Sequence, residues 1–246
     1  LSLSLLTLAL SAQSLKLLPQ QKLSKWGIKP QNYSGLTPIG NNRYAVGSDQ
    51  EPLDGFYIFR IEQDSITGKV TQVVDEGFFG NEAPKLDAWG SSARDLEGIA
   101  LHLPDSLIYL SGEGDQEILA YDLQGKRVAK RLDIPPHFGI DKIVNNGGFE
   151  SLSYCTSTQR FWTTTENALP ADGIEAIRLQ SFYNGKPTEA YAYPLDARRL
   201  SKKMKRYLCG VSDICALPNG DLLVLERELG VKKKYIGSKC SVNLYL

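Results

Sequence analysis

One pattern of apolar and polar positions occurs four times along the chain: a short apolar run, a turn, a second apolar run and an acidic residue. The segments begin at residues 34, 97, 150 and 212 and read SGLTPIGNNRYAVGSD, EGIALHLPDSLIYLSGE, ESLSYCTSTQRFWTTTE and SDICALPNGDLLVLE. Their turns are built from Gly, Asn, Asp, Pro, Ser and Thr, the residues that favour tight β-turns. Each segment therefore predicts two antiparallel strands joined by a hairpin.

Further strands are predicted after these hairpins. In the first three repeats a third and a fourth apolar run follow, joined by Gly-Lys turns at Gly68, Gly125 and Gly185. The unit is then a four-stranded antiparallel meander with the length of a β-propeller blade. The fourth repeat has one further run, SVNLYL at 241–246, and would end on a bare strand edge that native proteins avoid.

The predicted fold is thus all-β, a β-propeller of four-stranded antiparallel blades. We expect an incomplete ring with about four blades present, from a chain truncated at both ends. A closed ring of four blades is the compact alternative.

The first residues have the character of a targeting segment. Residues 1–12 read LSLSLLTLALSA, which is shorter than the roughly 20 apolar residues of a membrane span and fits the apolar core of a secretory signal. We interpret residues 1–14 as a signal-peptide remnant and 15–246 as the propeller domain; a buried helix or strand is the alternative for the first segment. The protein is then secreted or periplasmic, where its four cysteines can form up to two disulfides.

Composition removes several classes of protein. Lys and Arg number 28 and Asp and Glu also number 28, so the chain has no basic surplus for binding nucleic acid. No run is long enough for a transmembrane segment, and we expect a monomer. The Gly-x-Ser-x-Gly elbow of serine esterases, the His-Glu-x-x-His zinc motif and the phosphate-binding loop are all missing from the sequence.

Acidic residues occupy two recurrent places in the repeats, the start of the first strand and the end of the second. These places lie side by side in an antiparallel hairpin, and the first strand of a propeller blade lines the central channel. The pattern predicts that up to seven carboxylates converge on one mouth of that channel: Glu97, Glu150, Asp213, Asp49, Glu113, Glu166 and Glu226. Like charges at close range need a neutralising cation, and a flexible cage of carboxylate oxygens suits Ca²⁺.

The predicted chemistry follows from that cage. Bound Ca²⁺ would attract an anionic ester and activate a water molecule, with Glu97 or Glu150 as the general base. The alternative is that these side chains only cap loop N–H groups or face water, and Asp49 and Glu113 resemble exposed turn residues. Arg227 follows Glu226 in a strand, so it is predicted to point to the opposite face and to pack between blades.

Four motifs resemble the phytase-like family, the "esterase-like activity of phytase" domain of exported bacterial proteins. They are SGL…YAVGSD at 34–49, DLEGIA at 95–100, GGFESLSY…TTTENAL at 147–169 and GVSDICALPNGDLLVLERE at 210–228. The resemblance begins near Asn32 and implies a β-propeller and hydrolysis of phosphate esters.

The expected function is therefore an exported phytase-like hydrolase that uses Ca²⁺ to act on a small-molecule phosphate ester or other anionic ester. The alternatives are a lactonase-like metal-dependent propeller hydrolase and a non-catalytic propeller that binds a glycan or protein. A basic rim, for which Arg43 and Lys232–Lys234 are candidates, would favour phosphorylated substrates, whereas an aromatic, uncharged mouth would favour a glycan. Fold alone does not separate these functions.

Overall fold

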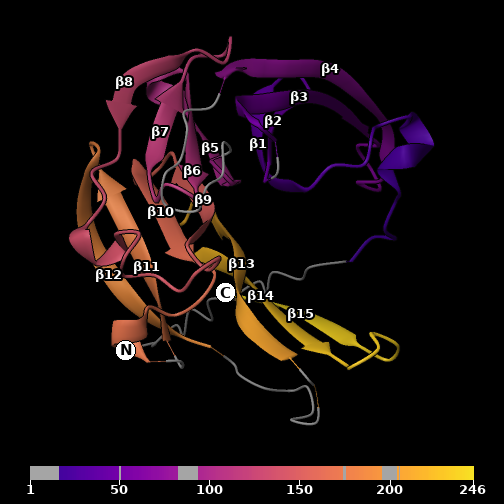
Figure 1. Ribbon diagram of the computed structural model, residues 1–246. Helices are drawn as coiled ribbons and strands as arrows, with labels where there is room; N and C mark the ends of the chain where they lie inside the picture. Colours follow the sequence, from indigo (N-terminus) through magenta and orange to yellow (C-terminus); the bar gives the residue numbers. More distant parts are fainter. Residues whose placement is uncertain (1–16, 50, 83–93, 174–175, 196–203, 205) are drawn as a thin grey trace, which may run out of the picture.

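The structure is a computed structural model, and it describes residues 17–49, 51–82, 94–173, 176–195, 204 and 206–246. The predicted signal remnant at residues 1–14 lies outside these ranges. Four antiparallel sheets follow one another along the chain, and within each sheet the strands are ordered as in the sequence. The predicted all-β propeller architecture is confirmed (Figure 1).

Three of the sheets have four strands and the last has three. The first contains β1 (Tyr33–Gly40), β2 (Arg43–Ser48), β3 (Leu53–Gln63) and β4 (Val70–Glu82). The second contains β5 (Leu96–His102), β6 (Leu107–Gly112), β7 (Ile118–Tyr121) and β8 (Arg127–Arg131). The third contains β9 (Phe149–Cys155), β10 (Arg160–Thr165), β11 (Ala176–Tyr183) and β12 (Lys186–Pro194). The fourth contains β13 (Arg206–Ala216), β14 (Leu222–Val231) and β15 (Lys239–Tyr245).

Helical structure is limited, in the ranges described, to four short 3₁₀ turns: η1 (Leu23–Trp26), η2 (Leu103–Asp105), η3 (Pro136–Phe138) and η4 (Pro170–Asp172). None of the helices in this part of the chain has the length and apolar character that crossing a bilayer requires. Cys155, Cys215 and Cys240 are free thiols, so none of these three forms the disulfide that export would favour.

The first strands of the sheets lie next to one another around a central axis, β1 beside β5, β5 beside β9 and β9 beside β13 (Figure 1). They come very close where a glycine intervenes. A Cβ atom at Gly98 of β5 would lie 2.4 Å from the backbone nitrogen of Leu152 in β9, so only glycine permits this approach. The four strands line a cavity of about 530 Å³, which confirms that they form the wall of the central channel.

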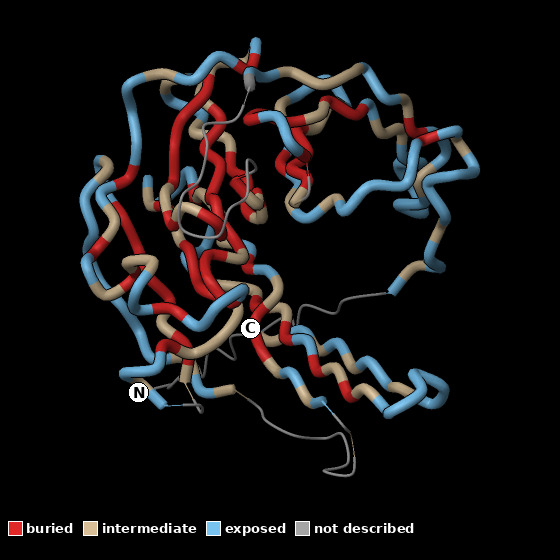
Figure 2. Tube along the Cα trace, in the orientation of Figure 1, coloured by how far each residue is buried: buried red, intermediate tan, exposed pale blue. Residues whose placement is uncertain are grey.

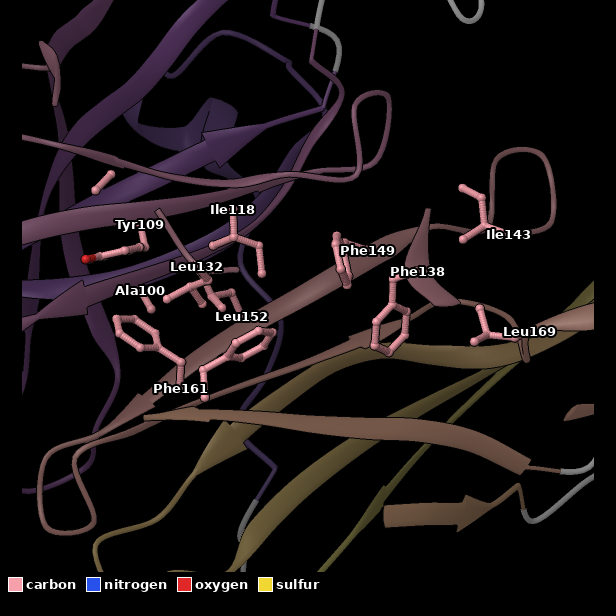
Figure 3. Close-up of a cluster of buried hydrophobic side chains, with 12 residues drawn as sticks. Ala100, Tyr109, Ile118, Leu132, Phe138, Ile143, Phe149, Leu152, Phe161 and Leu169 are labelled. Carbon is pink, nitrogen blue, oxygen red and sulfur yellow. The ribbon is translucent and has the colours of Figure 1, made fainter. Parts of the chain in front are cut away.

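The core lies between successive sheets, where many residues of the strands are buried (Figure 2). One cluster fills the space between the second and third sheets and includes Tyr109, Ile118, Phe149, Leu152 and Phe161 (Figure 3). A second cluster joins the first and second sheets. Burying these large side chains supplies most of the favourable free energy of folding, at about 25 cal/mol per Å² of apolar surface.

A buried polar network also joins the first and second sheets. Arg94, which is 1% exposed, precedes β5 and donates from Nε to Asp115 Oδ2 at 2.5 Å and from Nη1 to the Tyr121 hydroxyl at 2.7 Å. The Tyr121 hydroxyl in turn donates to Asp54 Oδ1 of β3 at 2.6 Å. The network fixes the chain just before the strand that carries Glu97.

Candidate functional site

A β-bulge occurs at the same place in all four sheets, near the start of the first strand. The register between first and second strands slips by one residue at positions that enclose Ser34, Glu97, Glu150 and Ser212. These are the residues at which the four sequence repeats begin. A bulge turns the extra residue out of the regular alternation, and bulges often lie beside active sites. The repeat thus places one irregular, polar position per blade at the same end of the channel.

Three carboxylates form the tightest group at this end. Asp49 follows β2, Asp95 precedes β5 and Glu97 lies in the bulge of β5. One oxygen from each side chain lies within 4.8 Å of the other two, and all three residues are half-buried. Asp49 and Glu97 were expected at the mouth, whereas Asp95 was not among the predicted residues. Its position two residues before Glu97 in DLEGIA was the available signal.

Asp95 has an unusual backbone conformation, with φ at +57°. This left-handed region is uncommon outside glycine, although Asp tolerates it better than most residues. Two backbone bonds hold it there: Glu113 N donates to Asp95 O at 2.8 Å, and Gly114 N donates to Arg94 O at 3.0 Å. A residue kept in a sparsely populated conformation by its surroundings is frequently part of a functional site.

Glu113 and Glu150 continue the group around the channel. Glu113 is 2% exposed, and its Oε1 accepts a hydrogen bond from Gly148 N at 2.8 Å, so its interpretation as an exposed turn residue is wrong. Burial raises the pKa of Glu113 to about 7, although the bond from Gly148 opposes the shift. Burial followed by the charge of Glu166 raises the pKa of Glu150 to about 8.

Glu97 carries the largest shift of the group. Burial, and after it the charges of Glu150 and Asp49, raises the pKa of Glu97 to about 10. The charges of Asp95 and Glu113 act in the same direction. Glu97 is therefore the point at which carboxylates from three blades repel one another, and a cation placed there would relieve the largest electrostatic cost.

The remaining predicted residues divide into two groups. Glu166 and Asp213 both raise the pKa of Glu150, and Asp213 also lines the central cavity. Glu226 does not join them: its side chain is 1% exposed and accepts a hydrogen bond from the Tyr193 hydroxyl of β12 at 2.8 Å. We call the remaining set the acidic mouth, which comprises Asp49, Asp95, Glu97, Glu113, Glu150, Glu166 and Asp213.

Arg227, rather than Glu226, faces the acidic mouth. Its Nη2 lies 2.5 Å from Glu166 Oε1, and its charge lowers the pKa of Glu150. Glu226 and Arg227 point to opposite faces of β14, as predicted. Arg227, however, is the one that lies on the face towards the mouth. Arg43 lies at the other end of β2 from Asp49, where it pairs with Glu76, and Lys232–Lys234 are exposed beyond the end of β14.

A comparison of the chain with known protein families matches residues 28–245 to the Phytase-like model, described as "Esterase-like activity of phytase". The chain belongs to the Phytase-like family. The match covers all four sheets and every member of the acidic mouth, which confirms the resemblance seen in the four sequence motifs.

Solved structures similar to this Phytase-like chain have low sequence identity. A streptogramin B lyase is 13% identical with a TM-score of 0.44, over 88% of this chain and 55% of that one. A chain of a nidogen–laminin complex is 13% identical with a TM-score of 0.43, over 86% and 64%. A virginiamycin B lyase from Staphylococcus aureus is 10% identical with a TM-score of 0.39, over 87% and 70%. The chain spans less than two thirds of the length of the streptogramin B lyase and of the nidogen–laminin chain. A comparison with curated proteins finds no match.

The raised pKa values predict how the stability of the metal-free Phytase-like protein depends on pH. Glu113, Glu150 and Glu97 keep their protons in the folded state up to about pH 7, 8 and 10, whereas in the unfolded chain they lose them near the ordinary glutamate pKa of 4.5. The folded state therefore binds more protons, and the free energy of unfolding should fall as pH rises from about 5 to 8. The slope should reach about −1.4 kcal/mol per pH unit for each such group.

Urea unfolding at a series of pH values, in the presence of a chelator, measures this dependence. A free energy of unfolding that rises between pH 5 and 8 would contradict the prediction. Repeating the series with saturating Ca²⁺ should flatten or reverse the slope, because a bound cation favours the charged carboxylates.

Proposed function

We propose that this Phytase-like chain is a metal-dependent hydrolase of small-molecule phosphate esters, with Ca²⁺ held by Asp49, Asp95 and Glu97 at the mouth of the propeller channel. The observation that carries the proposal is the group of three carboxylate oxygens within 4.8 Å of one another. The family description, an esterase-like activity of phytase, agrees with hydrolysis of an ester.

The donor set fits Ca²⁺ in number, type and spacing. Calcium takes 6–8 oxygen ligands at about 2.3–2.6 Å, so two oxygens on one ion are at most about 5 Å apart. The three oxygens meet that limit and leave positions for backbone oxygens, water or substrate. Mg²⁺ demands a stricter octahedron at about 2.0–2.1 Å and usually keeps several waters, which three converging carboxylates fit less well.

The neighbouring carboxylates have separate roles in this proposal. When bound, calcium would supply positive charge that attracts the ester and lowers the pKa of an attacking water. Glu150 is the better candidate for the general base, because it lies next to Glu97 but outside the group of three oxygens. It would accept the proton that the water loses as it attacks phosphorus. Glu113, held by Gly148 N, would position Asp95.

The charged character of the mouth favours this function over the alternatives. The acidic mouth has seven carboxylates, and one of them, Asp213, lines the central cavity of about 530 Å³, which is within the size range of small-molecule sites. A glycan site is expected to present aromatic side chains. Residues that line the cavity are mainly small or aliphatic, with Tyr154 as its one aromatic member in the described ranges.

Metal analysis followed by turnover tests the proposal. We expect the purified protein to bind about one Ca²⁺ per chain at this site, and to hydrolyse p-nitrophenyl phosphate with calcium but not with excess chelator. Binding of Ca²⁺ without turnover would favour the non-catalytic propeller. Turnover of a lactone but not of the phosphate ester would favour the lactonase-like alternative, and equal turnover with chelator would refute the metal dependence.

A further inference from the structure

Arg227 reaches the acidic mouth because the residue opposite it in the neighbouring strand is a glycine, which has no side chain. Arg227 lies opposite Gly210 of β13 in the antiparallel register. A Cβ atom at Gly210 would lie 2.1 Å from the backbone oxygen of Glu166, so glycine lets the chain after β10 pack directly on β13. Val211 N donates to that same oxygen at 3.1 Å. Glu166 is thereby brought within reach of the Arg227 guanidinium.

Most of the hydrogen-bonding capacity of this guanidinium is unused. One contact is made, from Nη2 to Glu166 Oε1, and the Nε and Nη1 groups donate to no residue in the described part of the chain. The Arg227 side chain is 43% exposed. Such an exposed ion pair contributes little to stability, about 0–1 kcal/mol, so the pair with Glu166 does not by itself account for an arginine in this place.

The position of Arg227 complements the proposed calcium site. Glu150 interacts electrostatically both with Arg227 and with Glu97, so the guanidinium and the three-carboxylate group both lie near the candidate base. The charge of Arg227 lowers the pKa of Glu150. A planar fork of N–H donors matches two oxygens of a phosphate group, which a lysine cannot do.

We infer that Arg227 binds the phosphoryl oxygens of the substrate and sets the preference for a phosphate monoester over a neutral ester. This inference rests on the proposed function of the acidic mouth. Glu166 holds the guanidinium towards the mouth before substrate binds and is a positioning residue. The free N–H groups on one edge of the guanidinium then meet the phosphate, while one N–H of Nη2 keeps its bond to Glu166.

Substitution of Arg227 tests the inference with two esters that share a leaving group. For Arg227→Met we expect KM for p-nitrophenyl phosphate to rise about 10- to 100-fold, the effect of losing hydrogen bonds to a charged group. The kcat for this ester should change by less than about threefold, and turnover of p-nitrophenyl acetate should not change. Arg227→Lys keeps the charge without the fork and should give a smaller rise in KM.

Arg43→Met is the matched control. Arg43 is 41% exposed and makes a similar ion pair with Glu76, but at the opposite end of its strand from the mouth. It should leave KM unchanged. Equal losses for both esters, or an unchanged KM for the phosphate ester in Arg227→Met, would overturn the inference. Thermal unfolding of each variant identifies any loss that comes from misfolding, and Arg227→Lys then carries the test.

A measurement of phosphate binding distinguishes a failure of this inference from a failure of the proposed hydrolase activity. If the wild-type protein hydrolyses neither ester, the proposed hydrolase activity fails, and calorimetric titration with inorganic phosphate in the presence of Ca²⁺ tests Arg227 alone. We expect the Kd for phosphate to rise about 10- to 100-fold in Arg227→Met. The same Kd in both proteins, or no phosphate binding by the wild type, would overturn the role of Arg227.

Discussion

Replacing Glu97 by Gln should reduce Ca²⁺ affinity at least tenfold and ester turnover about 100- to 10,000-fold. Glu97 contributes one of the three converging oxygens, and its carboxylate is the one most strongly affected by its neighbours. An amide keeps the shape of the side chain but removes the negative charge that a calcium ion requires. Isothermal titration with Ca²⁺ and initial rates on p-nitrophenyl phosphate measure the two effects.

Glu150→Gln distinguishes the ligand from the base. Because Glu150 lies outside the group of three oxygens, its amide should lower kcat by a similar factor, about 100-fold or more, while Ca²⁺ affinity changes by less than about threefold. Glu62→Gln is a matched control, since Glu62 bonds to Asn42 on the exposed part of the first sheet. Unchanged Ca²⁺ affinity and unchanged turnover in both mouth variants would remove the acidic mouth as a metal and catalytic site.

Replacing Arg94 by Met should destabilise the protein by about 3–5 kcal/mol, the usual cost of breaking a buried ion pair by removing one partner. The substitution leaves Asp54 buried without the guanidinium that lies 3.4 Å from its Oδ1, and it frees Asp115 and the Tyr121 hydroxyl from their bonds to Arg94. Urea unfolding monitored by fluorescence gives the change in free energy.

Arg43→Met again provides the comparison, because its ion pair with Glu76 is exposed and should contribute about 0–1 kcal/mol. A cost below about 1 kcal/mol for Arg94→Met would show that the buried network does not support the contact between the first two sheets. Since Arg94 directly precedes Asp95, we also expect weaker Ca²⁺ binding in this variant, measured under conditions where it remains folded.

The acidic mouth illustrates where reasoning from sequence reached its limit. The prediction that Asp49 and Glu97 lie close together depends on the repeats being propeller blades, because the two residues come from different sheets. In the structure both also lie close to Asp95, which does not occupy a recurrent position of the repeats. Glu226 follows the start of its repeat by 14 residues, whereas Asp49 follows its own by 15. Successive side chains in a strand point to opposite faces, so this difference of one residue places Arg227 at the mouth instead.

The strands, their hairpins and the recurrence of acidic residues at strand ends follow from the sequence alone, because alternation and turn residues act over a few neighbouring positions. Which of those residues share a site is visible only once the chain is folded. That outcome depends on how one sheet packs on the next: through the close approach at Gly98, through the bulge that contains Glu97, and through Gly210, which brings Glu166 to Arg227. Such contacts join residues far apart in the sequence, 61 positions in the case of Glu166 and Arg227, and no local pattern records them.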